Sequence, residues 1–348
     1  MTSTPSWAVL AAYLRCRSPA ADRAEVVHRQ QVRLGQLLAY VGRRSPYWRS
    51  RLPGAMRGAG CWATSPPAGR LADLPVVDVG DEPAAFDDVN TAGLRRRDVE
   101  AVVRGARPDQ REVPMGAYAV RVGAGGLLVS DARERALHIG ALLARVLPSS
   151  LMGAGCDRIA LLARLPVTLP RAVDWAPRRV QCTGLSLAEP VPVQLARLRA
   201  LGPTVLVGSP RRLRSVAERW ADEGTGALAR VVSVAAETSA HDAEVATAFG
   251  VRHLHRLYRA DEGLYGHTCA EGRLHLDEDL VIVERAWIDR RAGTYRPIVT
   301  DLFRTVVPRI RTRLDDVLTE SAERCPCGSP LRVVERVERV DATVAGPA

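Results

Sequence analysis

The sequence predicts an α/β protein in which helices cover a mostly parallel sheet and a smaller β-rich part follows. Between residues 158 and 249, short apolar segments alternate with segments of helical period, a pattern typical of parallel strands joined by helices. From residue 254 to 313 the segments become shorter and more polar, and tight turns separate them. The chain has 348 residues, 47% of them hydrophobic, which is enough for a substantial core.

The individual elements follow from local patterns. The apolar spacing of residues 1–52 predicts helix, with a break at Ser45-Pro46, and the glycine- and proline-rich residues 53–70 predict a loop. Strand, glycine turn and strand follow over residues 118–130, before a long helix that Asp131 would cap. The remaining expected elements are helices at 97–104, 190–201, 210–221 and 241–249, strands at 158–163, 204–207 and 230–235, and a last strand beginning near residue 330.

Three parts are expected along the chain: an α/β core over residues 1–253, a β-rich subdomain over 254–341 and a disordered tail over 342–348. The apolar segment Trp7–Leu14 has no basic stretch before it and ends at Arg15, so we interpret it as a packed helix rather than a signal peptide or membrane anchor. The seven cysteines are odd in number and scattered, which favours free thiols and a cytoplasmic location.

Arginine accounts for all 49 basic residues, and the formal net charge is +10. Codon bias in a GC-rich genome is the preferred explanation for the missing lysine. Because the sequence contains no lysine, it excludes any mechanism that needs a lysine of this chain. Paired arginines make nucleic acid a candidate partner. However, only 5% of the residues are aromatic, so the sequence does not indicate the aromatic stacking surface typical of proteins that bind single-stranded nucleic acid. An arginine-rich soluble surface is the preferred interpretation.

Two segments are candidates for binding a nucleotide. The backbone N–H groups of the glycine turn at 123–126 could donate hydrogen bonds to a phosphate, but the segment also fits an ordinary hairpin turn. The segment 257–263 combines an aromatic residue with two carboxylates and a glycine after a strand. That combination suits a ring stacked on a base beside a metal-binding carboxylate, and a solvated acidic turn is the alternative.

Three cysteines and one histidine form a candidate metal site. Cys325 and Cys327 lie on a sharp turn, and a hairpin loop at 271–273 would place Cys269 directly opposite His275. Three thiolates and one imidazole make a closed tetrahedral zinc site of the structural kind. His267 is the competing ligand.

Several segments together resemble the phenylacetate–coenzyme A ligase branch of the adenylate-forming superfamily. Within that branch they are most similar to the adenylating enzymes related to the synthetase that adenylates a deazaflavin coenzyme. The resemblance extends from about residue 25 to about residue 341. It rests on these segments in the expected order: RLGQLLAYVGRRSPYWRSRL, LPVVD, FDDVNTAG, GLLVSDARERALHIG, VLVGSPRRLRSVAE, VVSVAAET, LYRADEG, CAEGRLHLDEDLVIVE, VTDLF, PRIRTRLDDV and CPCG.

The resemblance implies the large domain of an adenylate-forming enzyme, with ATP or AMP, Mg²⁺ and a structural Zn²⁺ as cofactors. It implies a small-molecule carboxylic acid as substrate and coenzyme A or a carrier or partner protein as acceptor. A homodimer is one of the expected assemblies, and no association with a membrane is expected. The implied site residues are Glu262 for Mg²⁺ and phosphate, Ala236 and Glu237 beside the nucleotide, Tyr258 against adenine, Asp316 for the ribose hydroxyls, Arg339 at the hinge to a small domain, and Cys269, His275, Cys325 and Cys327 for zinc.

The sequence also departs from the family pattern. The phosphate loop shortens to VRVGAGG without a hydroxyl, so Gly125 and Gly126 would supply amides in its place, and the ribose motif carries Thr312 and Asp315 where the family has Tyr and Gly. The sequence ends seven residues after Asp341, where relatives continue into a lid domain with a lysine. We therefore expect an acid-activating ligase of specialised metabolism with impaired or partner-dependent turnover. The alternative is an inactive relative that binds a ligand or acts as a scaffold.

Overall fold

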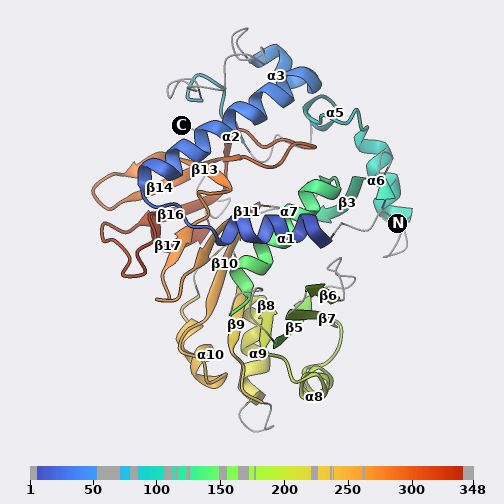
Figure 1. The fold of residues 1–348 in the computed structure, drawn as a ribbon, viewed down its shortest axis with the longest axis vertical. Coiled ribbons are helices and arrows are strands. Elements are labelled where there is room, and N and C mark those ends of the chain that lie inside the picture. The colour runs from blue at the N-terminus through green and yellow to red at the C-terminus, as the bar shows by residue number, and fades with distance from the viewer. Residues whose placement is uncertain are drawn as a thin grey trace.

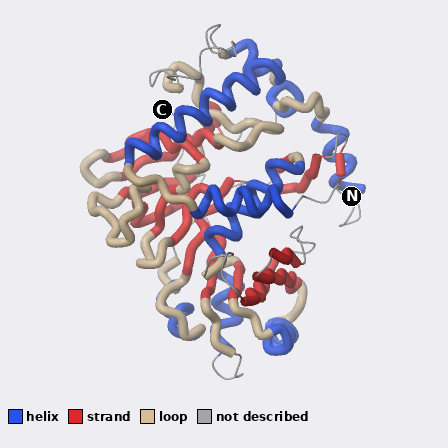
Figure 2. The backbone as a smooth tube through the Cα atoms, viewed as in Figure 1, coloured by secondary structure: helices blue, strands red, loops and turns tan. Residues whose placement is uncertain are grey.

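A computed structural model describes residues 6–52, 71–78, 85–105, 112–113, 117–122, 126–148, 155–163, 172–175, 178–220, 226–235, 237, 239–260 and 263–339. The predicted loop at 53–70 and the predicted tail at 342–348 lie outside these ranges. The architecture is α/β, as the sequence predicts, with helices around a large mixed sheet (Figures 1 and 2).

The elements lie close to the predicted positions. The helices are α1 (Ser6–Arg17), α2 (Arg23–Arg44), α3 (Pro46–Arg51), α5 (Phe86–Val89), α6 (Arg96–Gly105), α7 (Ala132–Val146), α8 (Val191–Leu201), α9 (Pro210–Trp220) and α10 (Asp242–Ala248). The strands up to residue 235 are β1 (Val77–Asp78), β2 (Glu112–Val113), β3 (Ala117–Val122), β4 (Gly126–Ser130), β5 (Gly155–Ala163), β6 (Ala172–Trp175), β7 (Arg178–Ser186), β8 (Val205–Gly208) and β9 (Arg230–Ala235). The later strands are β10 (His255–Ala260), β11 (Gly263–Thr268), β12 (Leu274–Leu276), β13 (Val281–Asp289), β14 (Thr294–Asp301), β15 (Thr312–Arg313), β16 (Asp316–Glu320) and β17 (Val333–Arg339).

One sheet runs through most of the described residues. Its strand order is β1-β15-β14-β16-β17-β12-β11-β10-β9-β8-β5-β7-β6, and β13 pairs with β14. Five neighbouring strands of this sheet, β7, β5, β8, β9 and β10, are parallel to one another, which confirms the predicted parallel part. The strands on the other side of β10 pair mostly antiparallel. Because β9 pairs with β10, the sheet is continuous across residue 253. The expected domain boundary at that residue stays a prediction.

Helices bury both faces of the parallel strands. Alternate residues of β8 point to opposite sides: Val205 and Val207 join the core cluster that includes α1 and α7, while Leu206 joins the cluster of α8, α9 and α10. Figure 1 shows α9 against β8 and β9 in the lower half of the molecule, with α7 above. This two-sided burial explains why the strand sequences are continuous apolar runs rather than alternating ones.

The N-terminal helices pack onto the sheet through close contacts. A Cβ atom at Gly140 of α7 would lie 2.6 Å from the Cβ of Ala12 in α1, so α1 and α7 cross at a distance that only glycine permits. Asp22 caps helix α2: its side chain accepts a hydrogen bond from the backbone N–H of Glu25. Among the described helices, none combines the length and apolar character that crossing a bilayer requires.

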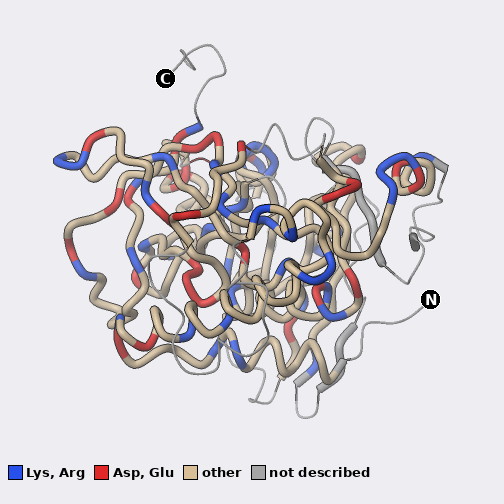
Figure 3. The backbone as a smooth tube through the Cα atoms, turned by 90° about the horizontal axis from the view of Figure 1, so that it is seen from above, with Lys and Arg blue, Asp and Glu red and all other residues tan. Residues whose placement is uncertain are grey.

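Basic and acidic residues are interspersed along the chain (Figure 3). Many arginines pair with carboxylates, for example Arg285 with Glu320 at 2.7 Å and Arg313 with Asp78 at 2.7 Å. Such exposed pairs contribute little to stability, on the order of 0–1 kcal/mol each. They do balance much of the arginine charge on this surface.

Candidate functional site

A largely apolar pocket of about 500 Å³ lies between α7 and the parallel strands. Its walls are the side chains of Leu142 and Val146 from α7 and of Ile159, Val207 and Val234 from β5, β8 and β9. The pocket also reaches Ala163, Gly208 and Ser209, where β5 and β8 end. Ligands of parallel α/β sheets bind outside the carboxyl ends of the strands, so the pocket lies where this topology places a ligand.

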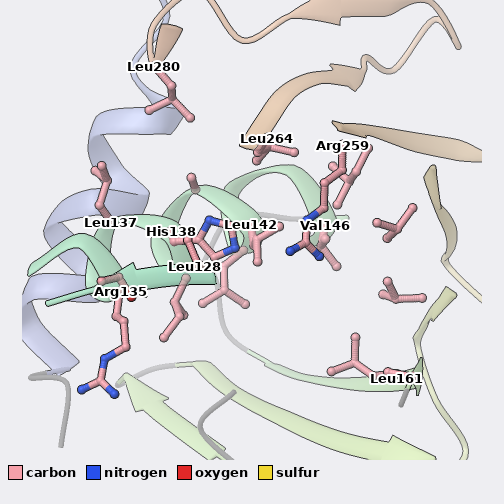
Figure 4. A pocket seen from close by; sticks show the side chains of 18 of the residues that line it. Leu128, Arg135, Leu137, His138, Leu142, Val146, Leu161, Arg259, Leu264 and Leu280 are labelled. Carbon is pink, nitrogen blue, oxygen red and sulfur yellow. The ribbon is translucent and has the colours of Figure 1, made fainter. Parts of the chain in front are cut away.

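A few polar side chains interrupt the apolar lining. Arg259 of β10, His138 of α7 and Arg304 of the loop after β14 all line the pocket. Figure 4 shows the His138 imidazole and the Arg259 guanidinium turned into the same space, with Leu142 between them. Burial, followed by the charges of the two arginines, lowers the pKa of His138 to about 4, so this imidazole is neutral at pH 7.

Glu134 joins the start of α7 to the loop after β14. Its Oε1 accepts hydrogen bonds from the backbone N–H of Thr305 (2.5 Å), the Thr305 hydroxyl (2.7 Å) and the backbone N–H of Val306 (2.7 Å). The N–H of Glu134 in turn donates to the Asp131 carboxylate at 2.8 Å, which confirms the predicted cap. Burial nevertheless raises the pKa of Glu134 to about 7, against the opposing effect of these hydrogen bonds.

This pKa predicts how a Glu134→Gln variant changes stability with pH. The folded-state pKa lies above the unfolded value of 4.5, so the wild type loses stability as pH rises from about 4.5 to about 7. The glutamine keeps the acceptor oxygen but carries no charge. We expect E134Q to match the wild type near pH 4 and to exceed it by up to about 3 kcal/mol at pH 8, as measured by urea unfolding.

The exposed Glu218→Gln substitution is the matched control for E134Q, because the Glu218 side chain is 64% exposed. Its unfolding free energy should follow the wild-type pH profile. Parallel profiles for E134Q and the wild type between pH 4 and pH 8 would contradict the raised pKa.

Tyr258 and Asp316, which the sequence assigns to the nucleotide, lie in direct contact. The Tyr258 hydroxyl donates a hydrogen bond of 2.8 Å to the Asp316 carboxylate. The two residues are only 1% and 3% exposed. Burial and the neighbouring carboxylate raise the pKa of Tyr258 well above its usual value, so the phenol remains the proton donor. Neither residue presents an open face in this structure, and their roles stay predictions.

The other predicted nucleotide residues are placed only in part. Arg339, the last residue of β17, is the register partner of Asp316. Glu237 is exposed just beyond the carboxyl end of β9. Gly126 begins β4, which pairs antiparallel with β3, so the glycine segment joins two hairpin strands. Glu262, Ala236 and Gly125 lie outside the described residues.

The predicted metal ligands come together, although the predicted hairpin register is wrong. His267 is the partner of His275, and the N–H of Cys269 donates to the carbonyl of Arg273 at 2.9 Å. The loop therefore covers residues 270–272. Gly272, with a φ of 77°, takes the last loop position, where a left-handed residue is needed. Cys269 lies diagonally across from His275 rather than directly opposite it.

Two similar turns present the cysteines. The N–H of Gly272 donates to the carbonyl of Cys269 at 3.1 Å, and the N–H of Gly328 donates to the carbonyl of Cys325 at 3.2 Å. Both glycines have a φ of 77°. In each turn a cysteine is followed three residues later by a left-handed glycine, so the two thiols face each other from equivalent positions.

The geometry of the four side chains fits zinc. The Sγ atoms of Cys269 and Cys325 are 3.7 Å apart, Cys327 Sγ is 3.5 Å from His275 Nε2, and all four ligand atoms lie within 4.8 Å of one another. Tetrahedral Zn²⁺ with ordinary bond lengths separates two sulfurs by about 3.8 Å and sulfur from nitrogen by about 3.5 Å. The carbonyl of Leu331, 3.1 Å from His275 Nδ1, would hold the ring with Nε2 towards the ion.

The competing ligand His267 lies outside this group. Its Nδ1 is 2.6 Å from the carboxylate of Asp277, which is itself fully buried. With four protein ligands and no open position, an ion held here would be structural.

Sequence reasoning missed the polar pocket residues His138, Arg259 and Arg304. They come from a helix, a strand and a loop far apart in the sequence, so no local spacing links them. The available signals are weak: a histidine within the apolar face of α7, and an arginine inside a buried strand.

No family model matches this sequence, and no curated protein matches it either. Solved structures do. A 2-hydroxyisobutyryl-CoA ligase in complex with 2-HIB-AMP and CoA is similar with a TM-score of 0.63 and 14% identity, over 91% of this chain and 70% of that one. The chain has the fold of the adenylate-forming ligases. The same ligase in its thioesterification state gives a TM-score of 0.63 at 15% identity, over 93% and 70% of the two chains.

A second kind of ligase shares the fold. The GH3.15 acyl acid amido synthetase is similar with a TM-score of 0.51 and 12% identity, over 93% of this chain and 71% of that one. The fold that the resemblance implies is therefore confirmed. The finer phenylacetate–coenzyme A ligase branch stays a prediction.

Proposed function

We propose that this protein activates a carboxylic acid with ATP. A carboxylate oxygen would attack the α-phosphorus, pyrophosphate would leave, and an acyl-adenylate would form. A thiol such as that of coenzyme A, or an amine, would then attack the acyl carbon and release AMP. The observation that carries this proposal is the apolar pocket at the carboxyl ends of the parallel strands, in a fold shared with an acyl-CoA ligase and an acyl acid amido synthetase.

The proposed roles of individual residues follow the strand ends. Tyr258 and Asp316 would lie beside the adenosine, and Glu237 follows β9 on the same edge of the sheet. Glu262 follows β10 in sequence and would hold Mg²⁺, while Gly125 and Gly126 would donate amides to phosphate oxygens. The zinc centre would serve to fix the turns around Cys269 and Cys325.

ATP–pyrophosphate exchange across a panel of straight-chain and aryl acids tests the proposal. We expect exchange that depends on the acid, with or without co-purifying proteins. Asp316→Asn should weaken ATP binding at least about tenfold, since a charge-assisted hydrogen bond is lost, whereas Asp315→Asn, at its exposed neighbour, should not. Absence of both exchange and nucleotide binding would overturn the proposal. Nucleotide binding without exchange would favour the inactive relative.

A further inference from the structure

Arg259 occupies the junction between the proposed nucleotide site and the apolar pocket. It directly follows Tyr258 in β10, and neighbouring strand residues point to opposite faces of a sheet. Tyr258 turns to Asp316, and Arg259 lines the pocket beneath α7. Tyr258 pairs with Ala235, the last residue of β9, and Arg259 is the last residue but one of β10, so its cation lies at the carboxyl ends of these parallel strands, where the reacting group of an acid would have to lie.

Arg304 brings a second cation to the same pocket. The Asp301 carboxylate accepts hydrogen bonds from the N–H groups of Phe303 (3.0 Å) and Arg304 (3.1 Å), which fixes the loop that carries both residues. Arg259, Arg304 and His138 line the same pocket, and the charges of the two arginines both lower the pKa of the His138 imidazole. His138 is neutral there and adds a polar group without a charge.

Of the described side chains that line the pocket, more are basic than acidic. Arg135, Arg259 and Arg304 line it, against Asp301 and Glu134, and the Glu134 carboxyl has a pKa of about 7. The rest of the lining is almost entirely aliphatic. Its volume of about 500 Å³ lies within the range of roughly 300–1,000 Å³ in which proteins bury small organic ligands.

We propose that Arg259 and Arg304 bind the carboxylate of the acid, and that the acid has a bulky, uncharged, apolar tail that lies along α7. This inference rests on the proposed function, because it concerns the acid to be activated. Guanidinium groups bind carboxylates through short, charge-assisted hydrogen bonds, and these strengthen where apolar walls exclude water. Beside Leu142, Val146 and Ile159 a second charged group on the tail would meet aliphatic side chains, so we expect monocarboxylic acids to bind more tightly than dicarboxylates or amino acids.

Binding of acids and their matching amides tests the carboxylate contact without ATP. The probes are 4-phenylbutyrate with 4-phenylbutanamide and octanoate with octanamide, measured by calorimetry on the full chain. We expect the wild type to bind each acid at least about tenfold more tightly than its amide. Arg259→Gln should weaken acid binding about 10- to 100-fold and leave amide binding within twofold, so that the preference for the acid disappears.

Three variants separate charge recognition from damage to the fold. Arg259→Lys should retain part of the preference because it retains the charge. Arg133→Gln, on the exposed side of α7, should leave it unchanged. Leu142→Trp should fill the pocket, weakening dodecanoate binding at least about tenfold while butanoate binding stays within twofold.

The outcomes distinguish this inference from the proposed function. Equal affinity for acid and amide in the wild type, or binding of neither probe pair, would overturn the carboxylate contact even if exchange with ATP occurs. A carboxylate preference that Arg259→Gln abolishes, in a protein that neither binds ATP nor exchanges pyrophosphate, would support the contact and overturn the proposed function.

Discussion

Replacing Cys325 with serine should abolish the binding of one zinc ion per chain and lower the thermal stability. The Cys325 Sγ lies 3.7 Å from that of Cys269, within a group of four ligand atoms. Structural zinc sites contribute about 10–16 kcal/mol in small zinc-binding peptides, and this site joins the β11–β12 hairpin to the turn before β17. We expect a loss of more than about 3 kcal/mol in unfolding free energy, measured together with metal content by elemental analysis.

Cys156→Ser is the matched control for this prediction. Cys156 is an exposed free cysteine in β5, outside the candidate centre, so its loss should change neither zinc content nor melting temperature. A chelator that removes the ion from the wild type should lower the melting temperature to that of the Cys325→Ser variant. Wild-type protein that contains no zinc, or a Cys325→Ser variant that melts with the wild type, would disprove the centre.

The candidate zinc ligands show both how far sequence reasoning reaches and where it ends. The residue types pointed to Cys269, His275, Cys325 and Cys327, with His267 as the competing ligand, and the structure brings those four side chains together. The hairpin register was wrong because a three-residue loop at 271–273 ignores the left-handed conformation that Gly272 adopts at the end of the loop. The ligands still meet, since a diagonal neighbour on the same face of a hairpin is also within reach of a shared ion.

The parallel strands β5, β8 and β9 were predictable for a physical reason that β6 and β7 lack. Burial on both faces favours an entirely apolar β8 and a largely apolar β9, which makes them visible in the sequence. Strand β7 mixes Gln181, Thr183 and Gly184 with apolar residues and pairs with the antiparallel β6, and it was not predicted. The pocket was not predictable either, because His138 and Arg259 meet only through tertiary packing.

Replacing Glu278 with glutamine should destabilise the protein by about 3–5 kcal/mol at pH 7. The Glu278 side chain is fully buried. One carboxylate oxygen accepts from Arg23 at 2.7 Å and from Arg332 Nε at 2.8 Å, and the other accepts from Arg23 at 2.5 Å and from the backbone N–H of Arg332 at 2.9 Å. A glutamine NH₂ group would face donors at one of these positions, and two guanidinium groups would lose their counter-charge.

The position of Glu278 makes this loss global rather than local. Arg23 begins α2 and Arg332 precedes β17, so the carboxylate joins the first part of the chain to the last described strand. Gln30 of α2 reinforces the junction, since its side chain donates to the carbonyls of Glu278 and Val281 at 2.9 Å each. Urea unfolding should therefore show a single cooperative transition that shifts to lower urea, rather than a separate early transition of α2.

The effect of Glu278→Gln should also depend on pH in a definite direction. Although burial opposes it, the two arginines hold the pKa of Glu278 below its ordinary value of 4.5. The carboxylate therefore contributes its full stability above about pH 4.5 and loses it as pH falls through the folded-state pKa. The difference between wild type and variant should shrink in that acid range. Glu100→Gln, at a partly exposed ion pair with Arg96, should change stability by less than about 1 kcal/mol at any pH. A Glu278→Gln effect as small as this would show that the carboxylate does not join the two ends of the fold.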